Sequence, residues 1–261
     1  MEQHETRAYD PDDFKPERAP QLAFPDDDWQ WFRDACADFS IPDPDTHRDT
    51  LQRLYSHLVH VNAWLNLTRI TDVRGYLKFH VLDSLSVLSL VENFTAPGDV
   101  VLDLGSGGGY PGLPLMTWLP DRHFVLVDSR PKKVAFLAET VRLTHCSLAQ
   151  ALAFRGREVA HFAPQLHNAC RLVTARAVGK AAELLTDCAE LLDDGGYFLC
   201  LKGQSYPTQE REHFLRTLPA AGFELLDELP IALDEEDPDR WCVVTSRLAG
   251  HGRRKKPARR R

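Results

Sequence analysis

The sequence predicts a doubly wound α/β fold, in which a mostly parallel seven-stranded sheet follows an N-terminal helical extension. Three observations predict it. After Pro97-Gly98 the apolar residues change from helical spacing to short continuous runs. Those runs alternate with further helical stretches, and the first of them ends in a cluster of glycines. Because strands that alternate with helices pair in parallel through right-handed crossovers, we expect one sheet.

The helical extension covers residues 26–97 and follows an acidic stretch, residues 1–25. That stretch holds four prolines and has no hydrophobic period, so we expect it to be mostly disordered. A short amphipathic helix is expected over residues 29–39, capped by the aspartates at 26–28. Apolar side chains at helical spacing predict two further helices, over residues 51–65 and 76–91.

The sheet domain covers residues 98–248. Its strand candidates are residues 100–104, 124–128, 149–154, 171–175, 197–201, 224–229 and 241–246. Helices are expected over 180–192 and 209–221, and another after the second strand, with Ser129 as its cap and Pro131 in its first turn. The final strand follows an acidic loop, residues 234–239, and is expected to pair as the last, antiparallel member.

Charge is distributed unevenly along the 261 residues, a length that allows one large domain with an extension or two small domains. The net charge is −7, but seven of the last nine residues are Lys or Arg, so the other 252 residues sum to −14. We expect the basic tail, residues 249–261, to bind a polyanion. A merely solubilising tail is the alternative.

Several classes of protein are excluded by what the sequence lacks. No stretch approaches the roughly 18 consecutive apolar residues of a membrane span, and the acidic start is unlike a signal peptide. The six cysteines form no C-x-x-C pair and several lie in apolar runs, which favours free thiols in a reducing compartment. No spacing typical of a metal site occurs. We therefore expect a cytoplasmic protein without membrane or metal partners.

The glycine-rich segment after the first strand carries the strongest chemical signal. It begins with D-x-G-x-G at Asp103, Gly105 and Gly107, where glycines let a ligand approach the backbone closely. A G-x-G-x-x-G also occurs there, so a nicotinamide cofactor is an alternative. An acid at the strand end suits the cationic sulfonium and ammonium of S-adenosylmethionine better than a pyrophosphate. Asp128 ends the next strand, where a carboxylate can bind both ribose hydroxyls of an adenosine cofactor.

Several short segments between residues 50 and 205 match a known pattern. They are Asn66-Leu67-Thr68, His80 with Asp83-Ser84-Leu85, Pro111-Gly112-Leu113-Pro114-Leu115, Asp128-Ser129, Lys132-Lys133, Phe136-Leu137, Arg176-Ala177 and Leu201-Lys202-Gly203. On these segments the chain resembles the bacterial family of small-subunit (16S) ribosomal RNA guanine-N7 methyltransferases, also called glucose-inhibited division protein B. The resemblance implies a Rossmann-like class I methyltransferase that uses S-adenosylmethionine. It also implies a partner, small-subunit ribosomal RNA or its precursor particle, on which we expect the protein to act as a monomer.

The glycine-rich motif, the resemblance and the basic tail together assign residues to roles. The expected cofactor residues are Asp103, Gly105, Gly107, Tyr110, Asp128, Glu158, Val159 and Arg176. The candidate catalytic residues are His80, Asp83 and Arg176, although His80 and Asp83 can equally form a local hydrogen-bonded pair on one helix. The expected RNA contacts are Asn66, Lys202, Arg253, Arg254, Lys255 and Lys256. Helix capping by Asn66 and solvation of Lys202 are the alternatives.

Two positions depart from the family pattern. Val61 stands where the family usually has Trp, and Phe79 stands where it usually has Arg. If that Arg contacts RNA, this protein must supply the charge from another residue, for which Lys78 is a candidate.

The absence of certain motifs favours a ring nitrogen as the methyl acceptor. Guanine N7 is an exposed lone pair with no proton to lose, so positioning alone can supply much of the acceleration and no general base is required. No Cys follows Pro or Thr, as cytosine-C5 enzymes require, and Thr174-Ala175-Arg176-Ala177 replaces the N-P-P-Y-like segment of adenine enzymes. The alternatives are methylation of another RNA or a small molecule, and a non-catalytic ribosome assembly factor that retains the cofactor fold.

Overall fold

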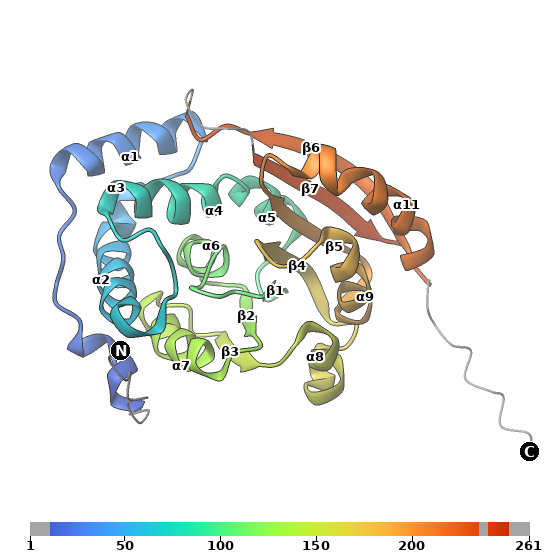
Figure 1. The fold of residues 1–261 in the computed structure, drawn as a ribbon, viewed down its shortest axis with the longest axis horizontal. Helices are drawn as coiled ribbons and strands as arrows, with labels where there is room; N and C mark the ends of the chain where they lie inside the picture. The colour runs from blue at the N-terminus through green and yellow to red at the C-terminus, as the bar shows by residue number, and fades with distance from the viewer. Residues whose placement is uncertain (1–10, 235–239, 251–261) are drawn as a thin grey trace, which may run out of the picture.

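A seven-stranded sheet forms the centre of the protein in the computed structural model, which describes residues 11–234 and 240–250 (Figure 1). The strand order is β3-β2-β1-β4-β5-β7-β6. Strands β1 to β5 pair in parallel, and β7 is antiparallel to both β5 and β6. The predicted doubly wound, mostly parallel seven-stranded sheet is therefore confirmed. The strands are β1 Val100–Leu104, β2 His123–Asp128, β3 Ala149–Ala153, β4 Cys170–Arg176, β5 Leu192–Lys202, β6 Phe223–Ile231 and β7 Arg240–Arg247.

Helices precede the sheet and connect its strands. Before β1 lie α1 Asp26–Asp38, α2 Arg48–Leu65, α3 Val73–Tyr76, a π-helical stretch Leu77–Leu82, α4 Asp83–Leu85 and α5 Leu88–Phe94. The connecting helices are α6 Gly112–Trp118, α7 Pro131–Thr140, α8 Gly156–Phe162, α9 Ala181–Leu191, α10 Tyr206–Gln209 and α11 Arg211–Ala221. Short 3-10 turns occupy Pro11–Phe14, Pro16–Arg18, Pro44–His47, Val141–Leu143 and Pro164–Leu166. Of the described helices, none combines the length and apolar character needed to cross a bilayer.

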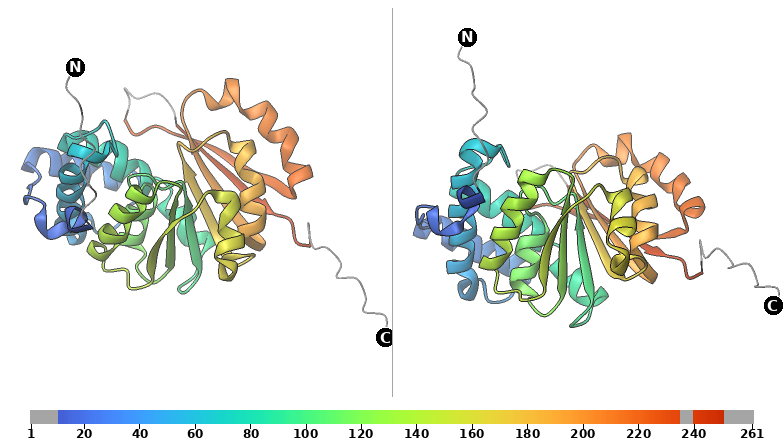
Figure 2. Two further views of the ribbon diagram at one scale, coloured as in Figure 1. Left: turned by 60° about the horizontal axis from the view of Figure 1, so that its bottom comes forward. Right: turned by 90° about the horizontal axis from the view of Figure 1, so that it is seen from below.

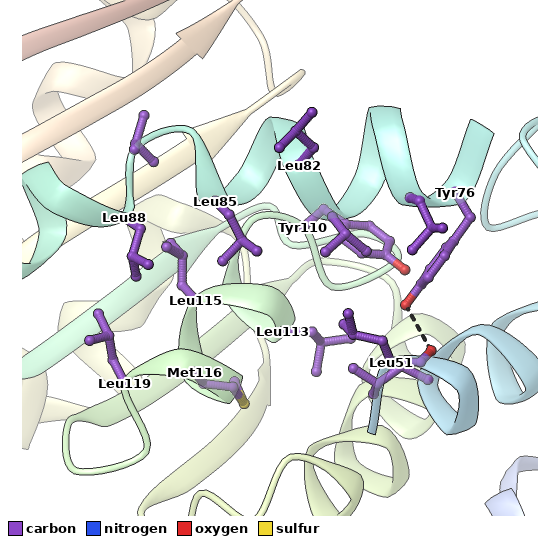
Figure 3. Close-up of a cluster of buried hydrophobic side chains, with 14 of the residues drawn as sticks. Leu51, Tyr76, Leu82, Leu85, Leu88, Tyr110, Leu113, Leu115, Met116 and Leu119 are labelled. Carbon is purple, nitrogen blue, oxygen red and sulfur yellow. Dashed lines mark hydrogen bonds between the residues drawn. The ribbon is translucent and has the colours of Figure 1, made fainter. Parts of the chain in front are cut away.

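Each face of the sheet buries its own hydrophobic core. On one face, α8, α9 and α11 pack against the sheet around side chains such as Val159 and Phe214. On the other face, α6 and α7 share a core with the N-terminal helices, in which Leu58 of α2 and Leu137 of α7 belong to the same buried cluster (Figure 2). In Figure 3, Leu85 and Leu88 of the helical run over 73–94 face Leu115 of α6. The helical extension is thus continuous with the core of the sheet domain.

The segment before α1 differs from the sequence expectation. Phe14 is 1% exposed and Phe24 is 3% exposed, and both belong to the core shared with α2 and α7. The backbone oxygen of Phe14 also lies 2.8 Å from Nε2 of buried His57 in α2. Residues 11–25 are therefore packed rather than disordered, because their few aromatic side chains find apolar partners far along the chain. Residues 1–10 lie outside the described part of the chain.

Three local expectations were also wrong. The aspartates at 26–28 form the first turn of α1 itself, after Pro25, and make no side-chain capping bond. Ser129 does not cap α7, which begins at Pro131 after Arg130. Strand β7 is antiparallel as expected, but it lies between β5 and β6 and leaves β6 at the edge. Burial explains this order, since Cys242, Val243 and Val244 are almost fully buried whereas β6 exposes several side chains.

Candidate functional site

A cavity of about 540 Å³ lies at the carboxyl ends of β1, β2, β3 and β4. Strand order reverses here, because β1 is flanked by β2 on one side and β4 on the other, and ligands of doubly wound folds bind at such a point. The lining comes from the ends of these strands and the segments that follow them, from the turn after α2, and from the π-helical stretch before β1. The lining residues are Leu67, Thr68, His80, residues 104–108, Tyr110, 127–130, Lys133, 154–156, 176–178, Leu184 and Asp187.

The glycine loop after β1 has a backbone that only glycine adopts easily. Gly105 has φ 75° and Gly107 has φ 59°, in the left-handed region where a Cβ is strained. A Cβ on Gly105 would also lie 2.2 Å from Cγ2 of Val178. The backbone nitrogens of Gly105 and Ser106 donate to the carbonyl of Val127, at 2.8 and 2.9 Å. The loop is therefore held close to β2 and presents bare backbone to the cavity.

Asp128 both shapes the loop and faces the cavity. Its Oδ2 accepts a hydrogen bond from the Gly107 nitrogen at 3.0 Å, and its Oδ1 accepts one from the Arg130 nitrogen at 2.8 Å. The residue is 8% exposed and lines the cavity. A carboxylate fixed at the end of the second strand is suited to accept hydrogen bonds from ribose hydroxyls.

Asp103 lies outside the cavity that it was expected to line. The residue is 1% exposed, its Oδ2 accepts from the Gly112 nitrogen at 3.1 Å, and its Oδ1 accepts from Oγ1 of Thr174 at 3.1 Å. Burial raises the pKa of its carboxyl to about 6, although these hydrogen bonds oppose that shift. Asp103 is buried and does not line the cavity, and its hydrogen bonds connect β1 to β4 and to the start of α6.

The structure does not bring Glu158 and Val159 to the cavity either. Glu158 accepts a hydrogen bond from the Arg155 nitrogen at 2.9 Å and so caps α8, while Val159 is fully buried beneath the sheet. The residues of this segment that do line the cavity are Phe154, Arg155 and Gly156. At this side of the cavity, the lining residues therefore lie two to five positions earlier in the chain than expected, between the end of β3 and the start of α8.

The three candidate catalytic residues do come together. One guanidinium nitrogen of Arg176, at the end of β4, donates to Asp83 Oδ2 at 2.5 Å and to the Phe79 carbonyl at 2.8 Å. The guanidinium also lies 5.3 Å from the ring centre of Tyr110, and the His80 ring stacks on that tyrosine at 4.4 Å. Tyr110 and Arg176 both line the cavity, as expected.

His80 is held in its neutral form. Burial and, secondly, the charge of Arg176 lower the pKa of its imidazole to about 3. Its Nε2 lies 2.9 Å from Oγ1 of Thr68, and its Nδ1 lies 3.5 Å from a guanidinium nitrogen of Arg176. Because a guanidinium can only donate, Nδ1 is the acceptor and Nε2 carries the proton that is given to Thr68.

A second cavity of about 710 Å³ adjoins the first. The two share His80, Arg176 and Ala177 as a common wall. The remaining lining of the second cavity is Ile70, Phe79, Asp83, Gly179, Leu201, Lys202, Gly203, Glu210 and Arg240. Arg240, from β7, lies 3.4 Å from Oδ1 of Asp83 and 5.3 Å from the ring centre of Phe79. Arg240 thus places a positive charge beside Phe79, the position at which the family usually has Arg.

The expected RNA contacts divide into three groups. Lys202 lines the second cavity. Asn66 is exposed, ends α2 in the left-handed conformation (φ 53°) and lines neither cavity. It is Asn62 that fixes this turn, since its Oδ1 accepts from the nitrogens of Leu67 and Thr68 at 2.6 and 2.9 Å. Arg253, Arg254, Lys255 and Lys256 lie outside the described residues.

Sequence reasoning did not find Phe154, Glu210 or Arg240. Glu210 precedes an amphipathic helix and Arg240 follows an acidic loop, positions that usually indicate surface residues. The aromatic that ends the β3 segment, Phe154, could have been found, because the residues that follow each parallel strand meet at one edge of the sheet. Within residues 11–234 and 240–250, no group of three potential metal ligands comes together.

The chain is similar to known proteins in both sequence and fold. The family model described as rRNA small subunit methyltransferase G matches residues 47–221. Proteins named "Ribosomal RNA small subunit methyltransferase G" are similar to the chain: that of Gloeobacter violaceus is 33% identical over 212 residues, 81% of this chain and 82% of that protein. That of Coxiella burnetii is 34% identical over 165 residues, 61% of this chain and 74% of that protein.

The structural likeness extends to more distant proteins. A solved structure titled as P. horikoshii TYW2 in complex with MeSAdo superposes with a TM-score of 0.50 at 16% identity. The match covers 65% of this chain and 62% of that chain, which is less than two thirds of its length. At this identity the likeness concerns the fold alone.

Proposed function

Because this chain belongs to the rRNA small subunit methyltransferase G family, we propose that it transfers the methyl group of S-adenosylmethionine to N7 of a guanine in small-subunit ribosomal RNA. The observation that carries the proposal is the pair of adjoining cavities that meet at His80, Arg176 and Ala177. One cavity suits an adenosine cofactor and the other suits a flipped base. The proposal includes a monomer that acts in the cytoplasm on the RNA or on its precursor particle.

The residues of the first cavity fit S-adenosylmethionine. The bare backbone of Gly105 and Gly107 allows close approach, and Asp128 offers carboxylate oxygens to ribose hydroxyls. Phe154, Arg155 and Gly156 form the side suited to the adenine. When bound, the cofactor supplies an electrophilic methyl group at its sulfonium.

The second cavity positions the acceptor and needs no base. Guanine N7 has a lone pair and loses no proton on methylation, so a neutral, fully engaged His80 is compatible with the reaction. Arg176 is locked by Asp83 and the Phe79 carbonyl, which fixes the wall between the cavities. Holding acceptor and donor in a defined geometry supplies a large part of the rate acceleration.

The test is to incubate the full-length protein with radiolabelled S-adenosylmethionine and small-subunit RNA from cells that lack the protein. N7-methylguanine makes the glycosidic bond labile after reduction, so aniline should then cleave the labelled RNA at one site. Label found in N6-methyladenine or C5-methylcytosine would contradict the proposal. Cofactor binding without methylation of any RNA or precursor particle would favour the assembly-factor alternative.

A further inference from the structure

An ion pair in the second cavity is fixed more firmly than a surface pair. Lys202 ends β5 and Glu210 precedes α11, and their Nζ and Oε2 atoms lie 2.7 Å apart. The Lys202 side chain is 8% exposed and that of Glu210 is 18% exposed. Nζ also donates to the Gly179 carbonyl at 3.0 Å, and Oε2 also accepts from the Ala181 nitrogen at 3.0 Å. Both charged groups are thus held by the loop after β4.

Each member of the pair keeps one unused bonding position. Among the residues that the structure describes, Oε1 of Glu210 has no hydrogen-bond partner, while Oε2 takes both bonds. Lys202 has three ammonium protons, of which two are directed at Glu210 and the Gly179 carbonyl. Since both residues line the cavity, the pair presents one acceptor beside one donor to an occupant.

That order of groups matches the Watson–Crick edge of guanine. Guanine offers an acceptor at O6 next to donors at N1 and N2, whereas adenine offers a donor at N6 next to an acceptor at N1. Lys202 can donate to O6, while Oε1 of Glu210, which has two lone pairs, accepts from both N1 and N2. With adenine, the Lys202 ammonium would face the N6 donor and the Glu210 carboxylate would face the N1 acceptor, so neither hydrogen bond could form. A phosphate suits the pair less well, because the Glu210 carboxylate would repel it.

We propose that Glu210 and Lys202 select guanine by binding its Watson–Crick edge, an inference that rests on the proposed function. Enzymes that act on a flipped base read it through that edge. N7 lies next to O6 on the adjoining Hoogsteen edge of the purine, so a base held through O6, N1 and N2 keeps N7 free for the methyl donor. The neighbouring wall of His80, Arg176 and Ala177 is where the two cavities join.

The experiment compares two RNAs that differ by one amino group. After the methylated guanine has been mapped, the same RNA is prepared with inosine at that position, which keeps N7, O6 and N1 but lacks the N2 amine. A hydrogen bond to a charged group predicts that the wild-type protein has a kcat/KM at least about 10-fold lower for the inosine RNA. Glu210→Gln should be slower on guanine and should lose most of this preference.

Controls separate specificity from folding and from the reaction itself. Glu212→Gln is the matched control, since that carboxylate is two residues away, 85% exposed and paired with Arg216 on the surface of α11. It should keep the wild-type preference, and both variants should bind S-adenosylmethionine as the wild type does. Equal rates of wild-type protein on guanine and inosine RNA would overturn the inference, whether or not the variant folds. An unchanged preference in Glu210→Gln would overturn it as well. Failure of the wild type to methylate even guanine RNA would instead refute the proposed function.

Discussion

At the scale of single residues, Asp128 connects the glycine loop after β1 to the cavity, because its two oxygens accept hydrogen bonds from the nitrogens of Gly107 and Arg130. Asp128→Ala should weaken binding of S-adenosylmethionine by about 10-fold or more, since hydrogen bonds to a charged group are worth roughly 1.5–3 kcal/mol each. Titration calorimetry measures this, with Asp38→Asn on the exposed end of α1 as a control. Tight binding of NAD to the wild type would contradict the assignment of the cavity.

Asp103 makes a second prediction at this scale, which concerns stability. Its pKa is raised by burial to about 6 in the folded protein, against 3.8 ordinarily. Because the folded protein holds this proton more tightly than the unfolded chain does, the protonated carboxyl favours folding at low pH. That stabilisation is lost as the pH rises from about 4 to 6. Over that range, the wild type should lose up to about 3 kcal/mol in free energy of unfolding relative to Asp103→Asn. Urea denaturation at several pH values measures the difference, and parallel curves for the two proteins would refute it.

At the scale of elements, the segment before α1 is part of the core. Phe14→Ala and Phe24→Ala should each lower the free energy of unfolding by about 3 kcal/mol or more, because each removes a fully packed aromatic side chain. Phe162→Ala is the matched control, since that ring is 61% exposed at the end of α8. Chemical denaturation compares the three variants. If Phe14→Ala were as stable as the control, the segment would not contribute to the fold.

At the scale of the whole molecule, the basic tail is expected to offset the charge of −14 carried by the remainder of the chain. If roughly four tail charges bind single-stranded RNA phosphates, removal of residues 253–261 should flatten the slope of log K against log salt by about 3 units. Affinity for S-adenosylmethionine should not change, since β7 and the cofactor cavity precede the tail. Filter binding at several salt concentrations tests this, and an identical slope would leave the tail a solubilising end.

The sequence by itself determined the parallel sheet, its first five strands and the glycine loop after β1. Alternation of buried runs with helical stretches is a local property, and each strand proved to lie within a few residues of its expected position. The glycines at 105 and 107 were equally informative, because a left-handed backbone excludes most other residues. Asp128 was predicted from its position at the end of the second expected strand. These features depend on neighbours in the chain, which a pattern can show.

Only the tertiary structure decided how distant segments meet. In the folded protein β7 lies between β5 and β6, and Phe14 is buried. Asp103 accepts hydrogen bonds from Thr174 and from the Gly112 nitrogen, and so connects β1 to β4 and α6. The tertiary structure also assembled the second cavity from β4, β5, β7, the helical run before β1 and the start of α11, and so paired Lys202 with Glu210. The physical reason is that such contacts arise from packing between elements far apart in sequence, and that packing leaves no periodic signal in any one of them.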